Sequence, residues 1–373
     1  MSARIVHLTT VHGPFDVRIF HKQAVTLARA GFDVTLIACT TEATECKGVR
    51  ILPLPPPRNR LERMTLTLWR AYRVALAQQA LIYHFHDPEL IPVGLLLKLH
   101  GRTVIYDVHE DVVKDIVDKA YIPFWIRPLV QAVARCWEAA GTLCFDQIVT
   151  ATTAIARNFP VNKTTLVRNV PIPGELAQPD PTPFRLRPRR VVYVGGLAPF
   201  NGAMTMVAAM AKLPADEDIR LTLAGKFASR VLEEECRRHP GWQRVDFHGW
   251  VGRDQISALF GQARAALVVY QPTPNIMECE PNKFFEVLSA GLPLIASNLP
   301  HWHRFIEEHH CGIAVDPTSP AAIAGAIRQL VDEPDQAEVM GNNGRFAVAR
   351  DYNWETDAAR LVALYRKLLT PER

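Results

Sequence analysis

Hydrophobic and polar positions alternate with two different periods along nearly the whole chain. Short apolar runs bounded by turn residues predict buried strands, and apolar positions three and four residues apart predict amphipathic helices. In the first half, strands are predicted at 4–11, 33–39, 49–55, 81–85, 103–108, 146–150 and 164–168. Helices are predicted between them at 17–30, 60–80, 88–99, 111–142 and 152–158. This alternation is typical of βαβ units and a parallel sheet.

The same alternation restarts after a proline-rich segment, residues 171–190. Strands are predicted there at 191–194, 219–224, 244–247, 265–270, 293–297 and 312–315, and helices at 202–212, 228–238, 253–263, 282–290, 301–309, 319–332, 335–349 and 354–369. We therefore predict an α/β protein with two Rossmann-like, doubly wound domains, 1–172 and 173–350. A C-terminal helix within 351–373 would cross back to the first domain. The two domains would face each other across a cleft at their strand ends.

The bulk composition supports a globular protein with more than one core. The chain has 373 residues, of which 48% are hydrophobic and 21% are charged. The net charge of +4 is too small to predict a nucleic-acid partner. Seven scattered cysteines predict neither a disulfide framework nor a zinc cluster, which favours a reducing cytosol. We expect a cytoplasmic protein, since the N-terminus leads straight into a strand and no apolar run reaches the roughly 18 residues of a spanning helix.

One segment, Glu278 to Gly291 (ECEPNKFFEVLSAG), concentrates candidate chemistry. Its apolar spacing predicts a helix that begins at Asn282, whose side chain could cap the first turn. Glu278 then precedes the helix, and Glu286 lies about one turn inside it. The free N–H groups of such a helix start suit a phosphate or a sugar hydroxyl. A surface loop and an ordinary helix with solvated charges explain the pattern equally well.

Glu278, Glu286 and the following AGLPLIAS match the signature of the retaining glycosyltransferases of the family-4 type, which the chain resembles over nearly its whole length. Further shared segments are FDVRIFHKQ, HFHDPELIPVG, IYDVHED, YVGGL, FHGWV and YNWE. The resemblance implies the GT-B fold, a nucleoside diphosphate sugar as donor, and no cofactor or bound metal. The acceptor would be a saccharide or a polyprenyl-diphosphate-linked saccharide, because the chain is most similar to the bacterial branch that builds exopolysaccharide and O-antigen.

The resemblance also implies roles in the donor site. Glu286 would accept hydrogen bonds from the ribose, and Glu278 would be a catalytic residue that steadies the sugar and its developing positive charge. The residues expected to bind the rest of the donor are Gly195, Gly196, Lys226, Asn282, Lys283 and Phe284. Family members usually carry Arg at position 196 and Lys or Arg at position 201, whereas this chain has Gly196 and Asn201.

Three explanations for this departure stay open. Lys283 and Lys226 could compensate for the missing cations, although Lys283 could equally be a solvated lysine. Donor turnover could be weakened. The protein could also be a catalytically silent GT-B relative that binds a sugar nucleotide or a partner enzyme. A GT-B sugar-nucleotide epimerase or hydrolase, which would use water and no acceptor, is a further alternative.

Polar residues in the first half are candidates for the catalytic and acceptor side. His109 follows a predicted strand and could donate to the donor sugar or phosphate, or it could be a structural histidine that caps Glu110. Asp16 could cap the first helix or orient the acceptor hydroxyl. Arg18 could fork onto a phosphate, and Lys22 lies on the same helix. A helix cap with a salt bridge is the structural alternative.

The segment HFHDPE, residues 84–89, has the residue types of a metal site. Strand alternation puts His84 and His86 on one face. The third and fourth ligands that a hydrolase metal site would need are not evident, so we expect no metal. Asp87 is expected to cap a helix that starts at Pro88.

Two stretches combine basic and aromatic residues, 58–73 (RNRLERMTLTLWRAYR) and 119–137 (KAYIPFWIRPLVQAVARCW). Such stretches can lie on an anionic membrane surface, here the inner face of the plasma membrane. Helices packed on a core with a solvated basic face have the same pattern.

Overall fold

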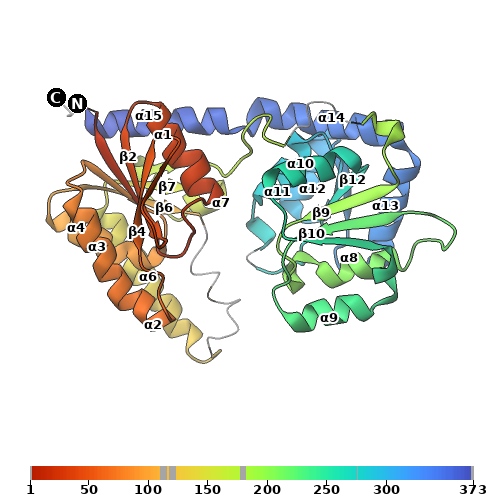
Figure 1. The fold of residues 1–373 in the computed structure, drawn as a ribbon, viewed down its shortest axis with the longest axis horizontal. Helices are drawn as coiled ribbons and strands as arrows, with labels where there is room; N and C mark the ends of the chain where they lie inside the picture. The colour runs from red at the N-terminus through yellow and green to blue at the C-terminus, as the bar shows by residue number, and fades with distance from the viewer. Residues whose placement is uncertain (1, 110–115, 117–122, 177–181, 275, 371–373) are drawn as a thin grey trace. The chain divides into compact units, whose positions relative to one another are not determined.

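The computed structural model describes residues 2–109, 116, 123–176, 182–274 and 276–370. The chain divides into two compact units (Figure 1). The first unit comprises Met1–Asn169 and Trp354–Arg373, and the second comprises Val170–Asn353. The C-terminal segment thus belongs to the first unit.

The first unit contains an eight-stranded sheet in the order β3-β4-β2-β1-β5-β6-β7-β8. The strands are β1 (Arg4–Leu8), β2 (Asp33–Cys39), β3 (Thr44–Cys46), β4 (Val49–Leu54), β5 (Ile82–Phe85), β6 (Thr103–Val108), β7 (Gln147–Thr150) and β8 (Thr164–Leu166). Neighbouring strands run parallel except β3 and β4. The short edge strand β3 was not predicted, because its three mostly polar residues show no strand period.

Helices cover both faces of this sheet (Figure 1). On one face, η1 (Val17–Ala24), α1 (Val25–Arg29) and α15 (Trp354–Leu369) contact one another. On the other face, α3 (Leu68–Ala77), α4 (Ile91–Leu99) and α6 (Arg127–Cys144) pack side by side. The shorter helices are α2 (Arg60–Glu62), η2 (Arg63–Thr67), η3 (Pro88–Leu90), α7 (Thr153–Ala156) and η4 (Val161–Lys163).

The first helix differs from the regular helix predicted at 17–30. Its first part, η1, is a π-helix, in which the His21 N–H donates to the Asp16 carbonyl oxygen at 3.2 Å. A π-helical turn is wider than an α-helical one and often lies at a functional site. Three polar side chains of η1 are buried, Arg18, Lys22 and Gln23. Their burial requires polar partners from elsewhere in the fold, which local periodicity does not reveal.

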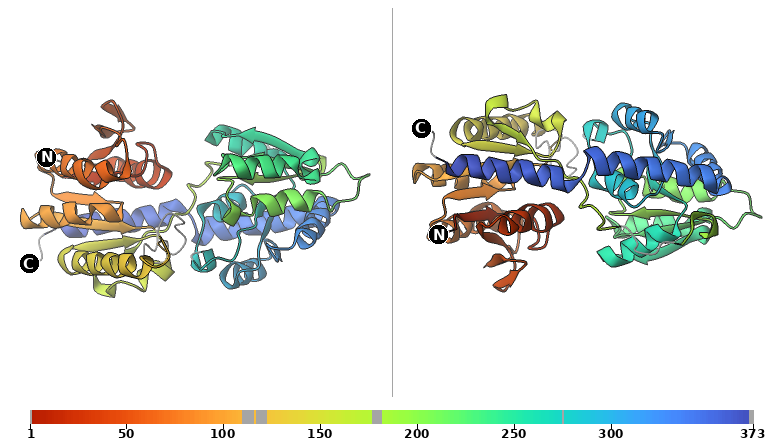
Figure 2. Two further views of the ribbon diagram at one scale, coloured as in Figure 1. Left: turned by 90° about the horizontal axis from the view of Figure 1, so that it is seen from below. Right: turned by 90° about the horizontal axis from the view of Figure 1, so that it is seen from above.

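The second unit contains a six-stranded parallel sheet in the order β11-β10-β9-β12-β13-β14. Its strands are β9 (Arg190–Val194), β10 (Arg220–Ala224), β11 (Val245–Gly249), β12 (Ala265–Val268), β13 (Leu294–Ser297) and β14 (Gly312–Val315). One face carries α8 (Ala203–Met210), α9 (Arg230–Arg238) and α13 (Pro320–Asp332), and the other carries α10 (Arg253–Gln262), α11 (Asn282–Ser289), α12 (Pro300–His309) and α14 (Pro334–Asp351) (Figure 2). Short turns are η5 (Phe184–Leu186), η6 (Pro199–Asn201), η7 (Pro240–Arg244) and η8 (Ile276–Glu278).

Both units are doubly wound α/β domains, which confirms the predicted fold class. In each sheet the strand order reverses next to the first strand of the unit, between β1 and β5 and between β9 and β12. Open α/β sheets bind ligands beyond the carboxyl ends of their strands at such a reversal. A ligand site is therefore expected at the loops after β1 and β5 and at those after β9 and β12, together with the neighbouring loops after β6 and β10. The cleft between the domains stays a prediction.

Candidate functional site

Two glycine turns meet at the carboxyl end of the second sheet. Gly195 follows β9 with φ of 144°, and Gly225 follows β10 with φ of 152°. The Gly195 N–H donates to the carbonyl oxygen of Ala224 at 2.8 Å. A Cβ atom on Gly225 would lie 1.8 Å from the carbonyl oxygen of Gly195. Only glycine fits this arrangement, which lets the two backbone turns approach each other closely beside the point where the strand order reverses.

Lys283, in the first turn of α11, reaches this glycine turn. A Cβ atom on Gly195 would lie 2.0 Å from its Nζ atom. Nζ donates to the Tyr193 hydroxyl at 3.1 Å and lies 4.7 and 5.3 Å from the ring centroids of Tyr193 and Tyr270. Burial lowers the pKa of Lys283 to about 8. The alternative of an ordinary solvated lysine is therefore wrong, because this ammonium is packed against aromatic rings and backbone.

The other residues predicted near the diphosphate lie on the same edge of the sheet. The Gly196 carbonyl oxygen accepts a hydrogen bond from the Tyr193 hydroxyl at 2.7 Å. Lys226 is exposed and directly follows Gly225. Asn201, at the position where relatives carry a second cation, is only 5% exposed. The structure therefore brings Lys283 to the turn where the resemblance expects Arg at position 196.

Glu286 lies on α11, one turn after Asn282, and its carboxylate bonds to both Asn282 and Arg253. The Asn282 amide donates to Glu286 Oε1 at 2.6 Å, and Arg253 Nη1 donates to the same oxygen at 2.7 Å. The Glu286 side chain is 12% exposed. Sequence analysis did not select Arg253, because its partner Glu286 follows 33 positions later in the sequence. An arginine at the first position of a helix is usually solvated.

Three details of α11 differ from the prediction. Pro281 is the residue that precedes the helix, and Asn282 does not cap the first turn but bonds to Glu286 instead. The Phe284 side chain is 2% exposed and belongs to the hydrophobic core, and its N–H donates to the Pro281 carbonyl oxygen at 3.0 Å. Phe284 therefore has no free group for a donor, which corrects its predicted binding role. Glu278 is exposed at the end of η8.

The structural alternative holds for Asp16 and Arg18. The Asp16 carboxylate accepts hydrogen bonds from the N–H groups of Arg18 and Ile19 at 2.8 and 2.9 Å, so it caps η1. The Arg18 guanidinium forks onto Asp107 at 2.6 and 2.9 Å and is 4% exposed. Buried in this way, Arg18 cannot reach a phosphate, which corrects the predicted contact.

Lys22 is likewise enclosed in the first unit. It is fully buried, and its Nζ donates to Asn169 Oδ1 at 2.7 Å. A direct contact of Lys22 with an acceptor is therefore wrong as well. Both corrections have the same cause: the charged groups of η1 bond to partners that come from distant parts of the sequence.

His109 lies at the carboxyl edge of the first sheet, directly after β6. Its Nε2 atom is 3.2 Å from His12 Nε2. His12 in turn lies 3.5 Å from carboxylate oxygens of both Asp16 and Asp87. Burial lowers the pKa of His109 to about 4, so its imidazole is neutral near pH 7. His12 was missed, although its position just after the first strand is a signal that could have selected it. Glu110, the predicted partner of His109, lies outside the described residues.

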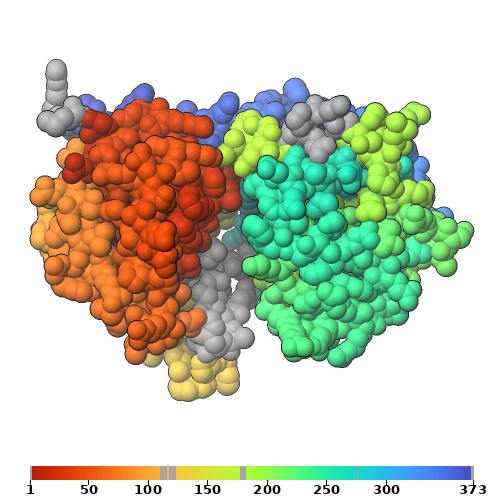
Figure 3. Space-filling model, viewed as in Figure 1, coloured from red at the N-terminus to blue at the C-terminus, as the bar shows by residue number. Residues whose placement is uncertain are grey.

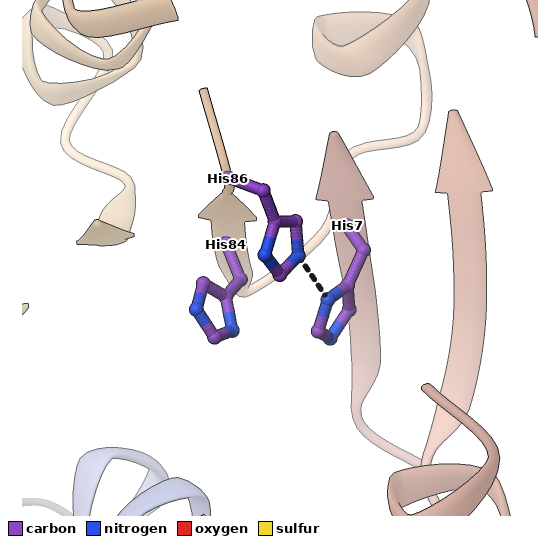
Figure 4. Close-up of side chains that lie close together, drawn as sticks. All are labelled: His7, His84 and His86. Atoms are coloured by element: carbon purple, nitrogen blue, oxygen red, sulfur yellow. Dashed lines mark hydrogen bonds between the residues drawn. The ribbon is translucent and has the colours of Figure 1, made fainter. Parts of the chain in front are cut away.

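The strand residues His84 and His86 do share one face, with ring centroids 4.7 Å apart. A third histidine, His7 on neighbouring β1, joins them (Figure 4). Metal-ligand atoms of the three lie within 4.8 Å of one another, and all three side chains are buried. Sequence analysis missed His7, because the pairing of β1 with β5 is a long-range contact.

A hydrogen-bonded chain links this histidine cluster to α15. Asp107 Oδ2 lies 2.9 Å from His86 Nδ1, and His86 Nε2 lies 2.9 Å from His7 Nδ1. The Tyr365 hydroxyl lies 3.3 Å from His7 Nε2 and 2.6 Å from His84 Nδ1. Because the Asp107 carboxylate can only accept, His86 donates to it through Nδ1. Burial lowers the pKa values of His7 and His84, which favours the neutral forms of these two side chains.

Asp87 does not cap the following turn, contrary to the prediction. No side-chain capping bond is present at the start of η3. Instead, Asp87 Oδ2 accepts hydrogen bonds from the Thr9 hydroxyl at 2.8 Å and the Thr10 N–H at 2.6 Å. It therefore shapes the loop after β1, which carries His12.

Most residues of 58–73 and 123–137 are exposed or half-buried on the first unit, whereas Leu68 and Tyr72 of the first stretch pack into the core (Figure 3). Residues 119–122 lie outside the described residues. Gly141 is the one buried residue among those described in α6. The exposed apolar residues of the two stretches are Leu61, Met64, Leu66, Trp69, Phe124, Trp125, Leu129, Val133 and Trp137. None of the helices in the described ranges combines the length and apolar character required to span a bilayer.

Comparisons with known proteins match both units. The model of the family "Glycosyl transferases group 1" matches residues 176–346, and that of the "Glycosyl transferase 4-like domain" matches residues 17–173. The MMP alpha-(1->4)-mannosyltransferase of Mycolicibacterium hassiacum is 23% identical over 310 residues, which cover 80% of this chain and 74% of that protein.

Solved structures resemble the whole fold. Sucrose-phosphate synthase from Thermosynechococcus elongatus aligns with a TM-score of 0.77 and 21% identity, covering 98% of this chain and 99% of its own. Anabaena HepE in complex with UDP-glucose aligns with a TM-score of 0.73 and 12% identity, covering 98% and 99%. Together the two family models span most of the sequence, and the chain therefore belongs to the glycosyltransferases with the two-domain GT-B fold.

Proposed function

We propose that the protein is a retaining glycosyltransferase that moves a sugar from a nucleoside diphosphate sugar to a saccharide or lipid-linked saccharide in surface polysaccharide biosynthesis. The observation that carries the donor assignment is the position of Lys283. Its ammonium lies against the Gly195 turn at the carboxyl end of the second sheet, where it can neutralise a diphosphate. Glu286 follows on the same helix, three positions later, and is available to the ribose.

The relatives support the choice of donor class. The mycobacterial relative is named as a mannosyltransferase, and HepE was solved with UDP-glucose. These names describe those proteins. They support a nucleotide-bound hexose as the donor here, and they favour transfer over simple binding.

In the proposed reaction, the acceptor hydroxyl oxygen attacks the anomeric carbon as the bond to the leaving diphosphate breaks. The leaving phosphate takes the hydroxyl proton. Glu278 offers an exposed carboxylate to the sugar and its positive charge. His109, neutral because burial lowers its pKa to about 4, can donate a hydrogen bond without adding charge. The reaction needs no bound metal in this scheme, since Lys283 supplies the positive charge.

A second candidate is a catalytically silent GT-B protein. The specific observation in its favour is the absence of cations at Gly196 and Asn201. A single ammonium whose pKa is lowered to about 8 stabilises a leaving diphosphate less than two permanent charges do. The silent protein would still bind the donor, so binding and turnover must be measured separately.

A thermal-shift panel of UDP, GDP, ADP and their sugars tests donor binding. A nucleotide present at 100 times its Kd should stabilise the protein by about 2.7 kcal/mol. Glu286→Ala should lose this shift, while Glu307→Ala, an exposed change on α12, should keep it. No shift of the wild-type protein with any nucleotide would contradict the proposed donor. An unchanged shift in Glu286→Ala would contradict the ribose assignment.

Turnover is tested with the nucleotide sugar that gives the largest shift. Release of nucleoside diphosphate that requires a saccharide acceptor, with the anomeric configuration retained in the product, supports the transferase. Donor consumption without any acceptor would favour an epimerase or hydrolase, and binding without consumption would favour the silent protein.

We further propose that the first unit rests peripherally on the anionic inner face of the plasma membrane, where a lipid-linked acceptor would be found. Phe124, Trp125 and Leu129 are 80%, 70% and 66% exposed, next to Arg127 at the start of α6. Exposed aromatic residues beside a cation can insert at the headgroup level of an anionic bilayer.

A further inference from the structure

Arg253, the first residue of α10, joins two carboxylates on different elements. Its Nη1 atom donates to Glu286 Oε1 at 2.7 Å. Its Nη2 and Nε atoms donate to the two carboxylate oxygens of Glu175 at 2.5 and 3.2 Å. The guanidinium is therefore fixed as a fork on Glu175, and its third nitrogen, Nη1, donates to Glu286.

The two oxygens of Glu286 are used differently. Oε1 accepts both from Arg253, at 2.7 Å, and from Asn282, at 2.6 Å. An ionised carboxylate oxygen offers about two lone-pair sites, so these bonds occupy Oε1. Among the described residues, the side chains that donate to Glu286 do so at Oε1 and not at Oε2. The arrangement thus fixes the rotation of the carboxylate and reserves Oε2 for a ligand.

Glu175 is itself held in place. Glu175 lies near the start of the second unit, five positions after Val170. Its neighbour Leu176 is 2% exposed in the core, and the Leu176 carbonyl oxygen accepts from the Ser257 hydroxyl on α10 at 3.2 Å. Burial by itself would lower the pKa of Arg253, but the bonds to Glu175 and Glu286 raise it, so the guanidinium stays charged.

We propose that Arg253 is a positioning residue for nucleotide binding, which holds Oε1 of Glu286 so that Oε2 faces the ribose hydroxyls of the donor. This inference rests on the proposed function, because it assumes that Glu286 binds the ribose. Asn282 shares the task from within α11. Glu175 fixes the guanidinium from the segment at the start of the second unit. Arg253 thus connects this segment to the Glu286 carboxylate that would bind the ribose.

The test compares ribonucleotides with nucleotides that lack the two hydroxyls. Kd values are measured by calorimetry for UDP and GDP and for their 2′,3′-dideoxy analogues. The variants are Arg253→Gln, Arg253→Lys and Glu175→Gln. Arg230→Gln is the matched control, since Arg230 is an exposed arginine that pairs with Glu234 on α9 of the same unit.

Loss of a charged hydrogen bond that orients Glu286 should weaken ribonucleotide binding by about tenfold in Arg253→Gln. Binding of the dideoxy analogue should change by less than about twofold, because it makes no bond to Glu286. Arg253→Lys should recover part of the loss, and Glu175→Gln should show a smaller loss of the same kind. Arg230→Gln should match the wild type.

Two results would overturn the inference while leaving the donor assignment intact. An equal loss for ribose and dideoxy nucleotides would show that Arg253 acts on the phosphate or on the fold. Tighter ribonucleotide binding in Arg253→Gln would show that the guanidinium blocks the carboxylate. By contrast, a wild-type protein that binds neither nucleotide would overturn the proposed function itself.

Discussion

Replacing Lys283 by methionine should stabilise the free protein and weaken donor binding. Methionine keeps most of the length and volume of lysine, so the packing against Tyr193 and Tyr270 is largely retained. The change removes the ammonium that lies against Gly195. The two effects have opposite signs because the charge is unfavourable in the empty site and favourable when a diphosphate is present.

The stability effect follows from the pKa of Lys283. The ordinary value is 10.5 and burial lowers it to about 8, a difference that corresponds to roughly 3 kcal/mol. The side chain keeps some exposure, so solvent screening reduces the expected gain of Lys283→Met to about 1–2 kcal/mol. For a unit of this size, the melting temperature should rise by roughly 2–8 °C.

The gain should depend on pH with a definite sign. Between about 8 and 10.5 the unfolded chain binds the proton and the folded wild-type protein does not, so wild-type stability rises with pH in this window. The advantage of Lys283→Met is therefore fully present below pH 8 and disappears as the pH approaches 10.5. Donor affinity of the wild-type protein should fall as the pH rises through about 8, because the ammonium loses its proton.

Urea unfolding from pH 7 to pH 10.5 measures the stability, and calorimetry with UDP or GDP measures the affinity. Lys283→Met should weaken nucleotide binding by roughly 10- to 100-fold, the loss expected for a hydrogen bond to a charged group. Lys212→Met, at an exposed lysine after α8, is the control and should change neither property. A destabilised Lys283→Met, or one with wild-type nucleotide affinity, would refute the reasoning.

Two further predictions concern the first unit. Tyr365→Phe removes the hydroxyl that bonds to both His7 and His84, which should lower the free energy of unfolding by about 2–4 kcal/mol because two buried imidazole nitrogens lose their partner. Urea unfolding checks this against Tyr72→Phe, whose hydroxyl bonds to the exposed His100 and should matter less. Equal losses in the two variants would contradict the importance of the buried hydrogen-bonded chain. Trp125→Ser should reduce binding to phosphatidylglycerol vesicles by roughly tenfold in a flotation assay. High salt should also weaken vesicle binding by the wild-type protein, because it screens the attraction between basic residues and anionic lipid. Phe346→Ser, an exposed change in the second unit, is the control, and unchanged binding of Trp125→Ser would contradict the proposed surface.

Much of the fold could be predicted from the sequence, because strand and helix periods are local. Apolar runs such as residues 103–108 and 312–315 coincide with β6 and β14. The exceptions are elements whose pattern is not periodic, such as the polar edge strand β3 and the π-helix η1. Glu278 and Glu286 could be selected from their spacing, since the helix between them is a local feature.

The environments of the charged residues could not be predicted in this way. Arg18 and Lys22 have the pattern of solvated helix charges, yet the fold buries them against Asp107 and Asn169, which lie 89 and 147 positions away. The same holds for Arg253, whose two carboxylate partners lie on separate elements.

The sequence by itself therefore determined the two α/β domains, the order of their elements and the helix that carries Lys283 and Glu286. Only the tertiary structure decided which cations are available to a ligand and which are already neutralised by a buried carboxylate or enclosed by polar partners. The physical reason is that hydrophobic periodicity is read along the chain, whereas the free energy of a charge depends on burial and on partners that only the folded chain brings within hydrogen-bonding distance.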